Sequence, residues 1–285
     1  MMIDLKNTRL LGHRGARNEA PENTLFGFQH AHRLQKKGLS GVEFDVQLTA
    51  DGQLIVFHDD TLQRLCGLQA RVDQLNLHEI QRHTQSGHPI ITLDRLTQSI
   101  PSSIRPPVQA AKLENSYHSL SESSETSLND IITTGHLATS VHPLTSYTHI
   151  ELEIKTHERT PYPKLIQALV RYLLNTPLST LPLVLTSFDR QLLSQMQRHR
   201  ELSSLPRGLL IREPNLISSA PNTALQLGCT QLGIYYPLLN ERVIQYCHRY
   251  QLPVSAWTVN NLDIIKQLVD WQVDVIITDI PTQLL

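Results

Sequence analysis

The sequence predicts an α/β protein built as a (β/α)8 TIM barrel, and three observations support this fold. The chain has 285 residues, and one large barrel of about 250 residues fits that length as well as two average domains do. Short runs rich in Val, Ile and Leu alternate with segments of helical period, which indicates a parallel sheet. Nine strands are expected, and a hairpin accounts for the ninth. We therefore expect a single domain over residues 1–285.

The expected strands are short and apolar, and helical segments separate most of them. Strands are predicted at 8–13, 41–48, 53–58, 149–155, 182–187, 207–211, 231–236, 253–258 and 273–279. Helices are predicted at 23–37, 163–175, 189–200, 239–250 and 260–271. This alternation is typical of βαβ units.

The segment between Asp45 and His58 is too short for the crossover helix that joins two parallel strands. Asp51-Gly52 lies in it between alternating apolar residues, a strong signal for a two-residue hairpin turn. With these residues in the turn, Asp45 pairs directly with His58, and the two side chains lie on one face. The second arm is then an antiparallel return after the second strand, and eight parallel strands remain.

One segment, at about 97–148, interrupts the alternation before the third barrel strand. Roughly a third of its residues are Ser or Thr, and it has no clear strand period. A structureless stretch of about fifty residues is unusual inside a compact domain. We expect a polar surface insertion that is partly disordered or holds short helices near Asn129–Thr134.

Composition and charge exclude several classes of protein. With 40% hydrophobic and 18% charged residues, the chain can form a core. The net charge of −1 argues against a nucleic-acid or polybasic membrane binder. Three widely spaced cysteines argue against a disulfide framework and a thiolate zinc site. Neither a signal peptide nor a membrane-spanning run is visible, so we expect a cytoplasmic protein without stable membrane insertion.

Two of the predicted strands carry carboxylates at alternate positions. Glu43 and Asp45 share one face of their strand, while Glu151, Glu153 and Lys155 share one face of the third barrel strand. Helices cover the outside of a barrel, so these polar faces should point inward. Buried carboxylates need a partner or a metal, and oxygen ligands suit Mg²⁺ or Ca²⁺. A buried salt-bridge network with Lys155, or solvent-facing edge strands, is the alternative explanation.

Two of the 14 histidines end predicted strands, which sets them apart from the rest. His13 is followed by Arg14 after the first strand, and His58 lies beside Asp45 in the expected hairpin. Two imidazoles next to an anion held by a metal suit acid–base catalysis near neutral pH. Arg14 offers a planar fork for a phosphate or a carboxylate.

Together, several spaced motifs resemble the glycerophosphodiester phosphodiesterase family. The resemblance covers nearly the whole chain except 97–148. Its motifs are His13-Arg14-Gly15, Pro21-Glu22-Asn23-Thr24, Val42-Glu43-Phe44-Asp45-Val46, Val56-Phe57-His58-Asp59, Ile150-Glu151-Leu152-Glu153-Ile154-Lys155, Ser187-Phe188, Ala256-Trp257-Thr258-Val259 and Ile276-Ile277-Thr278-Asp279. Motifs in this order are far more specific than any one of them. In place of a Thr-rich stretch that is usual in the family, this chain has Gln63-Arg64-Leu65-Cys66.

The resemblance implies a distorted (β/α)8 barrel with its active site at the carboxyl ends of the strands. It implies a divalent cation, Ca²⁺ or Mg²⁺, on Glu43, Asp45 and Glu153. The implied acid and base are His13 and His58. The implied substrate-binding residues are Arg14 and Lys155 near the phosphate and Phe188 and Trp257 on the pocket wall.

The reaction implied by the resemblance is hydrolysis of a small-molecule glycerophosphodiester to sn-glycerol 3-phosphate and an alcohol. A cation, Arg14 and Lys155 would stabilise the charge that attack adds to the phosphoryl oxygens. One histidine would deprotonate the nucleophile and the other would protonate the leaving alkoxide, in either assignment. A lysophospholipase D type reaction on lyso-lipids and a non-enzymatic barrel that binds a phosphate ligand are the alternatives. The head group, the metal and the oligomeric state stay open.

Overall fold

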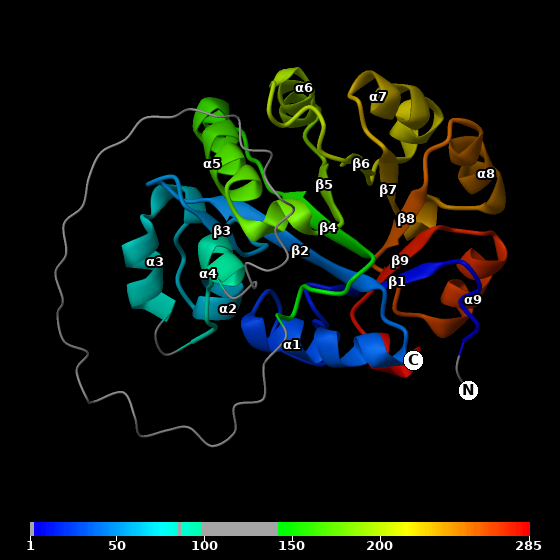
Figure 1. Ribbon diagram of the computed structural model, residues 1–285, viewed down its shortest axis with the longest axis horizontal. Helices are drawn as coiled ribbons and strands as arrows, with labels where there is room; N and C mark the ends of the chain where they lie inside the picture. Colours follow the sequence, from blue (N-terminus) through cyan, green and yellow to red (C-terminus); the bar gives the residue numbers. More distant parts are fainter. Residues whose placement is uncertain (1–2, 85–86, 99–141) are drawn as a thin grey trace, which may run out of the picture.

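The structure is a computed structural model that describes residues 3–84, 87–98 and 142–285. Within these residues the strand order is β1-β9-β8-β7-β6-β5-β4-β2-β3, and β1 also pairs with β2. The second pairing closes a barrel of eight parallel strands with helices around it (Figure 1). The remaining strand, β3, runs antiparallel to β2. The predicted (β/α)8 barrel with a hairpin after its second strand is therefore confirmed.

Each strand lies within its predicted range. The strands are β1 Arg9–His13, β2 Gly41–Leu48, β3 Leu54–Val56, β4 His149–Ile154, β5 Leu183–Ser187, β6 Arg207–Ile211, β7 Gln231–Tyr235, β8 Val254–Trp257 and β9 Val275–Thr278. The predicted helices are also present, with shorter or slightly shifted ends. The helices are α1 Leu25–Leu34, α2 Gln63–Cys66, α3 Leu77–Thr84, α4 Leu93–Gln98, α5 Tyr162–Leu174, α6 Arg190–Arg198, α7 Ala220–Gln226, α8 Glu241–Arg249 and α9 Leu262–Asp270. The sequence pattern did not reveal α2, α3, α4 or α7.

Side-chain caps explain where several helices begin. Thr24 precedes α1, and its hydroxyl accepts a hydrogen bond of 3.0 Å from the backbone of Gly27. Asp189, Asn240 and Asn261 cap α6, α8 and α9 in the same way. Such caps satisfy backbone N–H groups that lack a partner in the first turn. The predicted start of α1 at residue 23 is therefore two residues early.

The hairpin register differs from the predicted one by one residue. The backbone carbonyl of Asp45 accepts a hydrogen bond of 3.1 Å from the residue before His58, so the predicted direct pair of Asp45 with His58 is wrong. A backbone hydrogen bond of 2.9 Å from Thr49 to Gln53 closes a three-residue loop instead of a two-residue turn. Gly52 ends the loop at φ 84°, the left-handed conformation that this longer loop requires.

Alternate side chains of β2 and β4 point to opposite sides of the barrel wall, as predicted. The outward set packs in the main apolar core under the helices and comprises Val42, Phe44, Val46, Ile150, Leu152 and Ile154. Glu43, Glu151 and Glu153 point inward and line a cavity of about 30 Å³ together with side chains from five other strands. Two-residue periodicity thus delivers the carboxylates to the barrel interior.

Strands β1 and β3 occupy the same edge of β2, one after the other. Backbone pairing with β1 stops at Glu43, and pairing with β3 starts at Val46. Asn23 fills the interval: its side-chain amide donates to Oδ2 of Asp45 at 3.0 Å and accepts from the backbone of Asp45 at 3.4 Å. The start of α1 is therefore attached to the strand that carries the acidic residues.

A second apolar cluster supports the hairpin side of the molecule. It consists of Ile55, Phe57, Leu62, Val72, Ile80 and Ile90, and it is separate from the main core. Its residues come from β3, α3 and the loops beside them, which lie with α2 at one side of the barrel (Figure 1). We call this side of the molecule, with β3, α2, α3 and the loops between them, the hairpin lobe. His58 lies on it, outside the ring of barrel strands.

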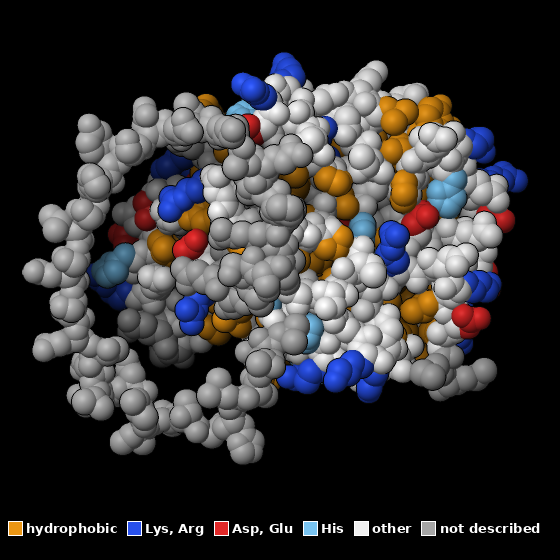
Figure 2. All heavy atoms as spheres, viewed as in Figure 1, with side chains coloured by type: hydrophobic (Ala, Val, Ile, Leu, Met, Phe, Trp, Pro, Cys, Tyr) orange, Lys and Arg blue, Asp and Glu red, His pale blue; other side chains and the backbone are white. Residues whose placement is uncertain are grey.

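The predicted polar insertion at about 97–148 lies for the most part outside the described residues, and the short helices expected near Asn129–Thr134 lie wholly outside them. In the described parts of the chain, no helix has the length and apolar character needed to cross a bilayer. On the face seen in Figure 2, acidic and basic side chains are mixed apart from a short row of basic ones below α1. This mixture agrees with the net charge of −1.

Candidate active site

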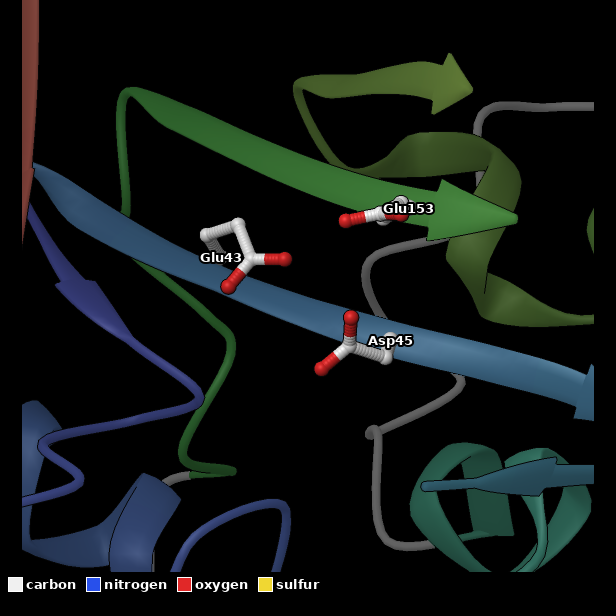
Figure 3. Close-up of side chains that lie close together, drawn as sticks. All are labelled: Glu43, Asp45 and Glu153. Carbon is white, nitrogen blue, oxygen red and sulfur yellow. The ribbon is translucent and has the colours of Figure 1, made fainter. Parts of the chain in front are cut away.

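Three carboxylates from two neighbouring strands meet inside the barrel. Glu43 and Asp45 come from β2, and Glu153 comes from the adjacent β4 (Figure 3). One oxygen of each lies within 4.8 Å of the other two. Glu43 and Asp45 are 5% and 1% exposed, so bulk water solvates their charges poorly. The structure thus assembles the three predicted metal ligands in one place.

Burial and mutual repulsion act on these carboxylates in different ways. Burial raises the pKa of Glu43 well above its ordinary value, and the nearby charges of Asp45 and Glu153 raise it further. Burial also raises the pKa of Glu153. For Asp45, the positive charges of Lys155 and Arg14 outweigh burial and lower the pKa well below its usual range. The pKa of Asp45 is thus lowered while those of Glu43 and Glu153 are raised, although the three groups lie side by side.

Two cationic side chains lie against the triad. Nζ of Lys155 is 2.6 Å from Oε1 of Glu153 and 3.1 Å from Oδ1 of Asp45. Nε of Arg14 is 3.2 Å from Oδ2 of Asp45. The salt bridges of the alternative explanation are thus present, but they exclude Glu43. In residues 3–84, 87–98 and 142–285, no Lys or Arg side chain forms an ion pair with Glu43.

The donor set fits a hard divalent cation. Every donor is a carboxylate oxygen, the ligand type that Mg²⁺ and Ca²⁺ prefer. Glu43 accepts one hydrogen bond, of 3.3 Å, from the backbone of Arg14. Oδ1 of Asp45 is buried and accepts no hydrogen bond, although Lys155 lies close to it. These two incompletely satisfied carboxylates are the groups that a bound cation would neutralise.

His13 is oriented by a carboxylate from the other end of the chain. Its Nδ1 is 2.6 Å from Oδ1 of Asp279, which follows β9, and Oδ2 of Asp279 accepts from the side chain of Asn260 at 2.8 Å. Nε2 faces Glu43 at 3.7 Å. Burial lowers the pKa of His13. Sequence reasoning missed Asp279 as a site residue, although its place directly after the last strand was an available signal.

His58 has the same arrangement on the hairpin lobe. Its Nδ1 is 2.7 Å from Oδ1 of Asp59, and its side chain is 34% exposed. Burial lowers the pKa of His58 as well. In both pairs an ionised carboxylate can only accept, so Nδ1 carries the proton and Nε2 is left free.

A cleft of about 590 Å³ connects these groups. Seven of the nine predicted site residues line it: His13, Arg14, His58, Glu153, Lys155, Phe188 and Trp257. Glu43 lines the small cavity next to it, where Glu153 and Trp257 also contribute. This volume is within the range of small-molecule sites, typically about 300–1,000 Å³.

An aromatic wall bounds the cleft opposite the hairpin lobe. The rings of Phe188 and Trp257 meet edge to face with centroids 5.5 Å apart, and Tyr235 lies 5.5 Å from Trp257. The guanidinium of Arg212 stacks 5.4 Å from the Phe188 ring. Sequence reasoning missed Arg212 and Arg17, which line the cleft, and Tyr235, which is not among the lining residues but contacts Trp257. Tyr235 is the register neighbour of Trp257, so it could have been found from the ends of the strands.

Comparisons with known proteins agree with this geometry. A model of the glycerophosphoryl diester phosphodiesterase family matches residues 13–283. A glycerophosphodiester phosphodiesterase of Bacillus altitudinis is 40% identical over 75 residues, which is 26% of this chain and only 29% of that protein's length. A glycerophosphodiester phosphodiesterase of Bacillus subtilis (strain 168) is 24% identical over 279 residues, covering 95% of this chain and 83% of that protein.

A solved structure has the same fold. It is a phosphodiesterase of Oleispira antarctica in complex with the product sn-glycerol-3-phosphate, and it aligns with a TM-score of 0.70 at 21% sequence identity. The alignment covers 97% of this chain and 94% of the other. The barrel, the motifs placed around one cleft and the match over residues 13–283 lead to one conclusion: this chain belongs to the glycerophosphoryl diester phosphodiesterase family.

Proposed function

We propose that this protein hydrolyses glycerophosphodiesters to sn-glycerol 3-phosphate and an alcohol, with the help of a divalent cation. The observation that carries the proposal is the convergence of a carboxylate triad and two carboxylate-oriented histidines around one cleft. The names of the relatives support the reaction, and the Oleispira antarctica structure contains sn-glycerol-3-phosphate.

Glu43, Asp45 and Glu153 would hold the cation, since their oxygens converge and two of them lack full hydrogen bonding. A bound Mg²⁺ or Ca²⁺ supplies positive charge next to the phosphoryl oxygens, where negative charge develops.

Arg14 and Lys155 would bind the phosphate. Both line the cleft and both are tied to the acidic groups, which fixes their charges in place before substrate arrives. Nη1 of Arg14 donates to Oε1 of Glu22 at 2.7 Å, so one edge of its planar fork is anchored. Positive groups that are already oriented stabilise a transition state without reorganisation.

His13 and His58 would perform the proton transfers through Nε2. One removes a proton from the nucleophile, either water or the neighbouring glycerol hydroxyl, and the other protonates the leaving alkoxide. Their carboxylate partners hold the neutral tautomer and stabilise the imidazolium that forms during the reaction. Phe188 and Trp257 would give an apolar surface to the carbon atoms of the substrate.

The test is release of sn-glycerol 3-phosphate from a panel of glycerophosphodiesters with EDTA, Mg²⁺ or Ca²⁺ present. We expect release that depends on the metal and that His13→Gln and Glu43→Gln abolish. His248→Gln is the matched control, because His248 forms a similar pair of 2.7 Å with Asp274, and neither residue lines the cleft. Lysophosphatidylcholine in the panel tests the lyso-lipid alternative. The proposal is wrong if the folded, metal-loaded protein releases product from no diester.

A further inference from the structure

Arg64 joins two carboxylates that belong to different parts of the site. It lies on α2, directly after the hairpin. Nε and Nη2 donate to the two oxygens of Asp59 at 2.6 and 3.0 Å. Nη1 and Nη2 donate to the two oxygens of Glu22 at 2.8 and 2.7 Å. One guanidinium therefore makes two bidentate contacts.

Each of these carboxylates also holds a residue of the proposed reaction. Asp59 binds Nδ1 of His58 at 2.7 Å, and Glu22 accepts from Nη1 of Arg14 at 2.7 Å. A continuous path of charged hydrogen bonds thus runs from the acid–base imidazole to the phosphate-binding guanidinium, with Arg64 at its centre. Burial acts to raise the pKa of Asp59 and of Glu22, but the arginine contacts lower each to about 2.

The path links two separately packed parts of the molecule. His58 and Asp59 lie on the hairpin lobe, whose apolar cluster is separate from the main core. Glu22 lies just before α1, which packs on the main core. Arg64 is not among the described residues that line the cleft, and its side chain is 41% exposed. It therefore acts through its neighbours and does not touch substrate.

We infer that Arg64 is a positioning residue that fixes His58 relative to Arg14. The inference rests on the proposed function, because that reaction gives both residues their roles. Arginine is required at this position, since only its rigid planar fork can hold two carboxylates by both oxygens at once. A lysine would supply the charge without the geometry.

Kinetics of Arg64→Gln and Arg64→Lys provide the first test. For both variants we expect kcat to fall by about tenfold to 100-fold, less than the roughly 10² to 10⁴ that a general acid or base itself contributes. Arg71→Gln is the control: Arg71, on the same lobe, pairs with Asp73 at 2.7 Å and more loosely with Asp60 at 3.5 Å, and it is not among the residues that line the cleft. Its kcat should stay within twofold of the wild type. A folded Arg64→Lys protein with wild-type kcat would overturn the inference.

A second measurement does not depend on activity. Nitrogen-15 NMR of labelled histidines at pH 8, assigned with His58→Gln, reports the ring tautomer. We expect a single Nδ1-protonated tautomer of His58 in the wild type and in Arg71→Gln, and a mixture in Arg64→Lys, where Asp59 is no longer held. An unchanged tautomer in a folded Arg64→Lys protein contradicts the inference. If the wild type hydrolyses no diester, the proposed function is wrong. The NMR measurement still shows whether Arg64 determines the tautomer of His58.

Discussion

At the scale of single residues, the two histidines owe their orientation to carboxylates that are placed very differently along the chain. Asp59 is the neighbour of His58, whereas Asp279 lies 266 residues from His13. Both hold Nδ1 of the ring, so a neighbour in the sequence and a residue from the other end of the chain favour the same tautomer. If the two histidines perform the proposed proton transfers, the loss of either carboxylate should impair them.

Asp279→Asn tests this dependence. The amide keeps the shape but removes the charge that stabilises the imidazolium, so we expect kcat to fall by about 100-fold or more. Initial rates at saturating substrate measure the effect, and the melting temperature shows whether the fold is kept. Asp274→Asn breaks the remote pair with His248 and should leave kcat unchanged. Equal effects of the two substitutions would show that Asp279 has only a structural role.

Glu22 gives a prediction for acid stability. Its pKa is lowered from 4.5 to about 2 in the folded protein, because contacts with Arg64 and Arg14 outweigh burial. A lowered pKa stabilises the fold at pH values above 4.5, and this stabilisation is lost as the pH falls toward 2. Urea unfolding should therefore show the wild type more stable than Glu22→Gln at pH 6, with the difference shrinking at pH 4 and again at pH 3. A constant difference at all three values would contradict the prediction.

At the scale of elements, β2 shows how one strand can serve both the core and the site. Its apolar residues pack outward and its acidic residues point inward. The edge of β2 that does not pair with β4 pairs first with β1 and then with β3. His13 ends β1, and the turn that follows brings Arg14 to the same end of the barrel. A close backbone approach makes this turn possible, because the carbonyl oxygen of Gly15 lies 1.8 Å from the position that a Cβ on Gly12 would occupy.

Gly12→Ala should therefore disturb both stability and activity. No side chain fits at this distance, so the turn must move, with a loss on the order of 1–3 kcal/mol in the free energy of unfolding. Urea unfolding and the hydrolysis assay measure the two effects. Gly67→Ala is the comparison: Gly67 has a positive φ of 70°, but nothing lies within 4 Å of an added Cβ. Backbone strain alone costs about 1 kcal/mol there, and activity should be kept. Similar losses in both variants would show that crowding at Gly12 is unimportant.

At the scale of the whole molecule, closure of the barrel brings the carboxylates of Glu43, Asp45 and Glu153 together in its interior. Of the eight parallel strands, two neighbours deliver three carboxylates into the barrel interior, where Glu43 and Asp45 are buried. Folding thus brings like charges together, which costs free energy unless a cation is bound. The site should therefore be stabilised by its metal and destabilised without it.

Thermal unfolding with and without metal tests this balance. Millimolar Mg²⁺ or Ca²⁺ should raise the melting temperature of the wild type by several degrees, since binding to the folded state at 100 times Kd contributes about 2.7 kcal/mol. Glu43→Gln should lose that shift. In EDTA the same variant should melt above the wild type, because the substitution removes a buried carboxylate whose pKa is strongly raised. Sodium chloride at equal ionic strength is the control. A wild type that melts above Glu43→Gln in EDTA would contradict this account.

Much of the fold follows from local pattern. Strand and helix alternation, the strong turn signal at Asp51-Gly52 and the two-residue period of β2 and β4 predicted the barrel, the antiparallel arm and the inward carboxylates. These features depend on residues close together in the sequence, so they can be predicted from the local order of apolar and polar residues. The same patterns placed His13 and His58 at the ends of predicted strands, whereas Phe188 and Trp257 were expected at the site only from the resemblance to the family.

Other features were decided only by the tertiary structure. The hairpin register depended on whether the loop has two or three residues, which the hydrogen bonds around Thr49 settle in favour of three. The contacts of Asp279 with His13 and of Arg64 with Glu22 join residues far apart in the chain, as does the wall where Arg212 meets Phe188. These residues come into contact only when the barrel closes and the hairpin lobe packs against it. Local sequence patterns therefore cannot predict which residues pair.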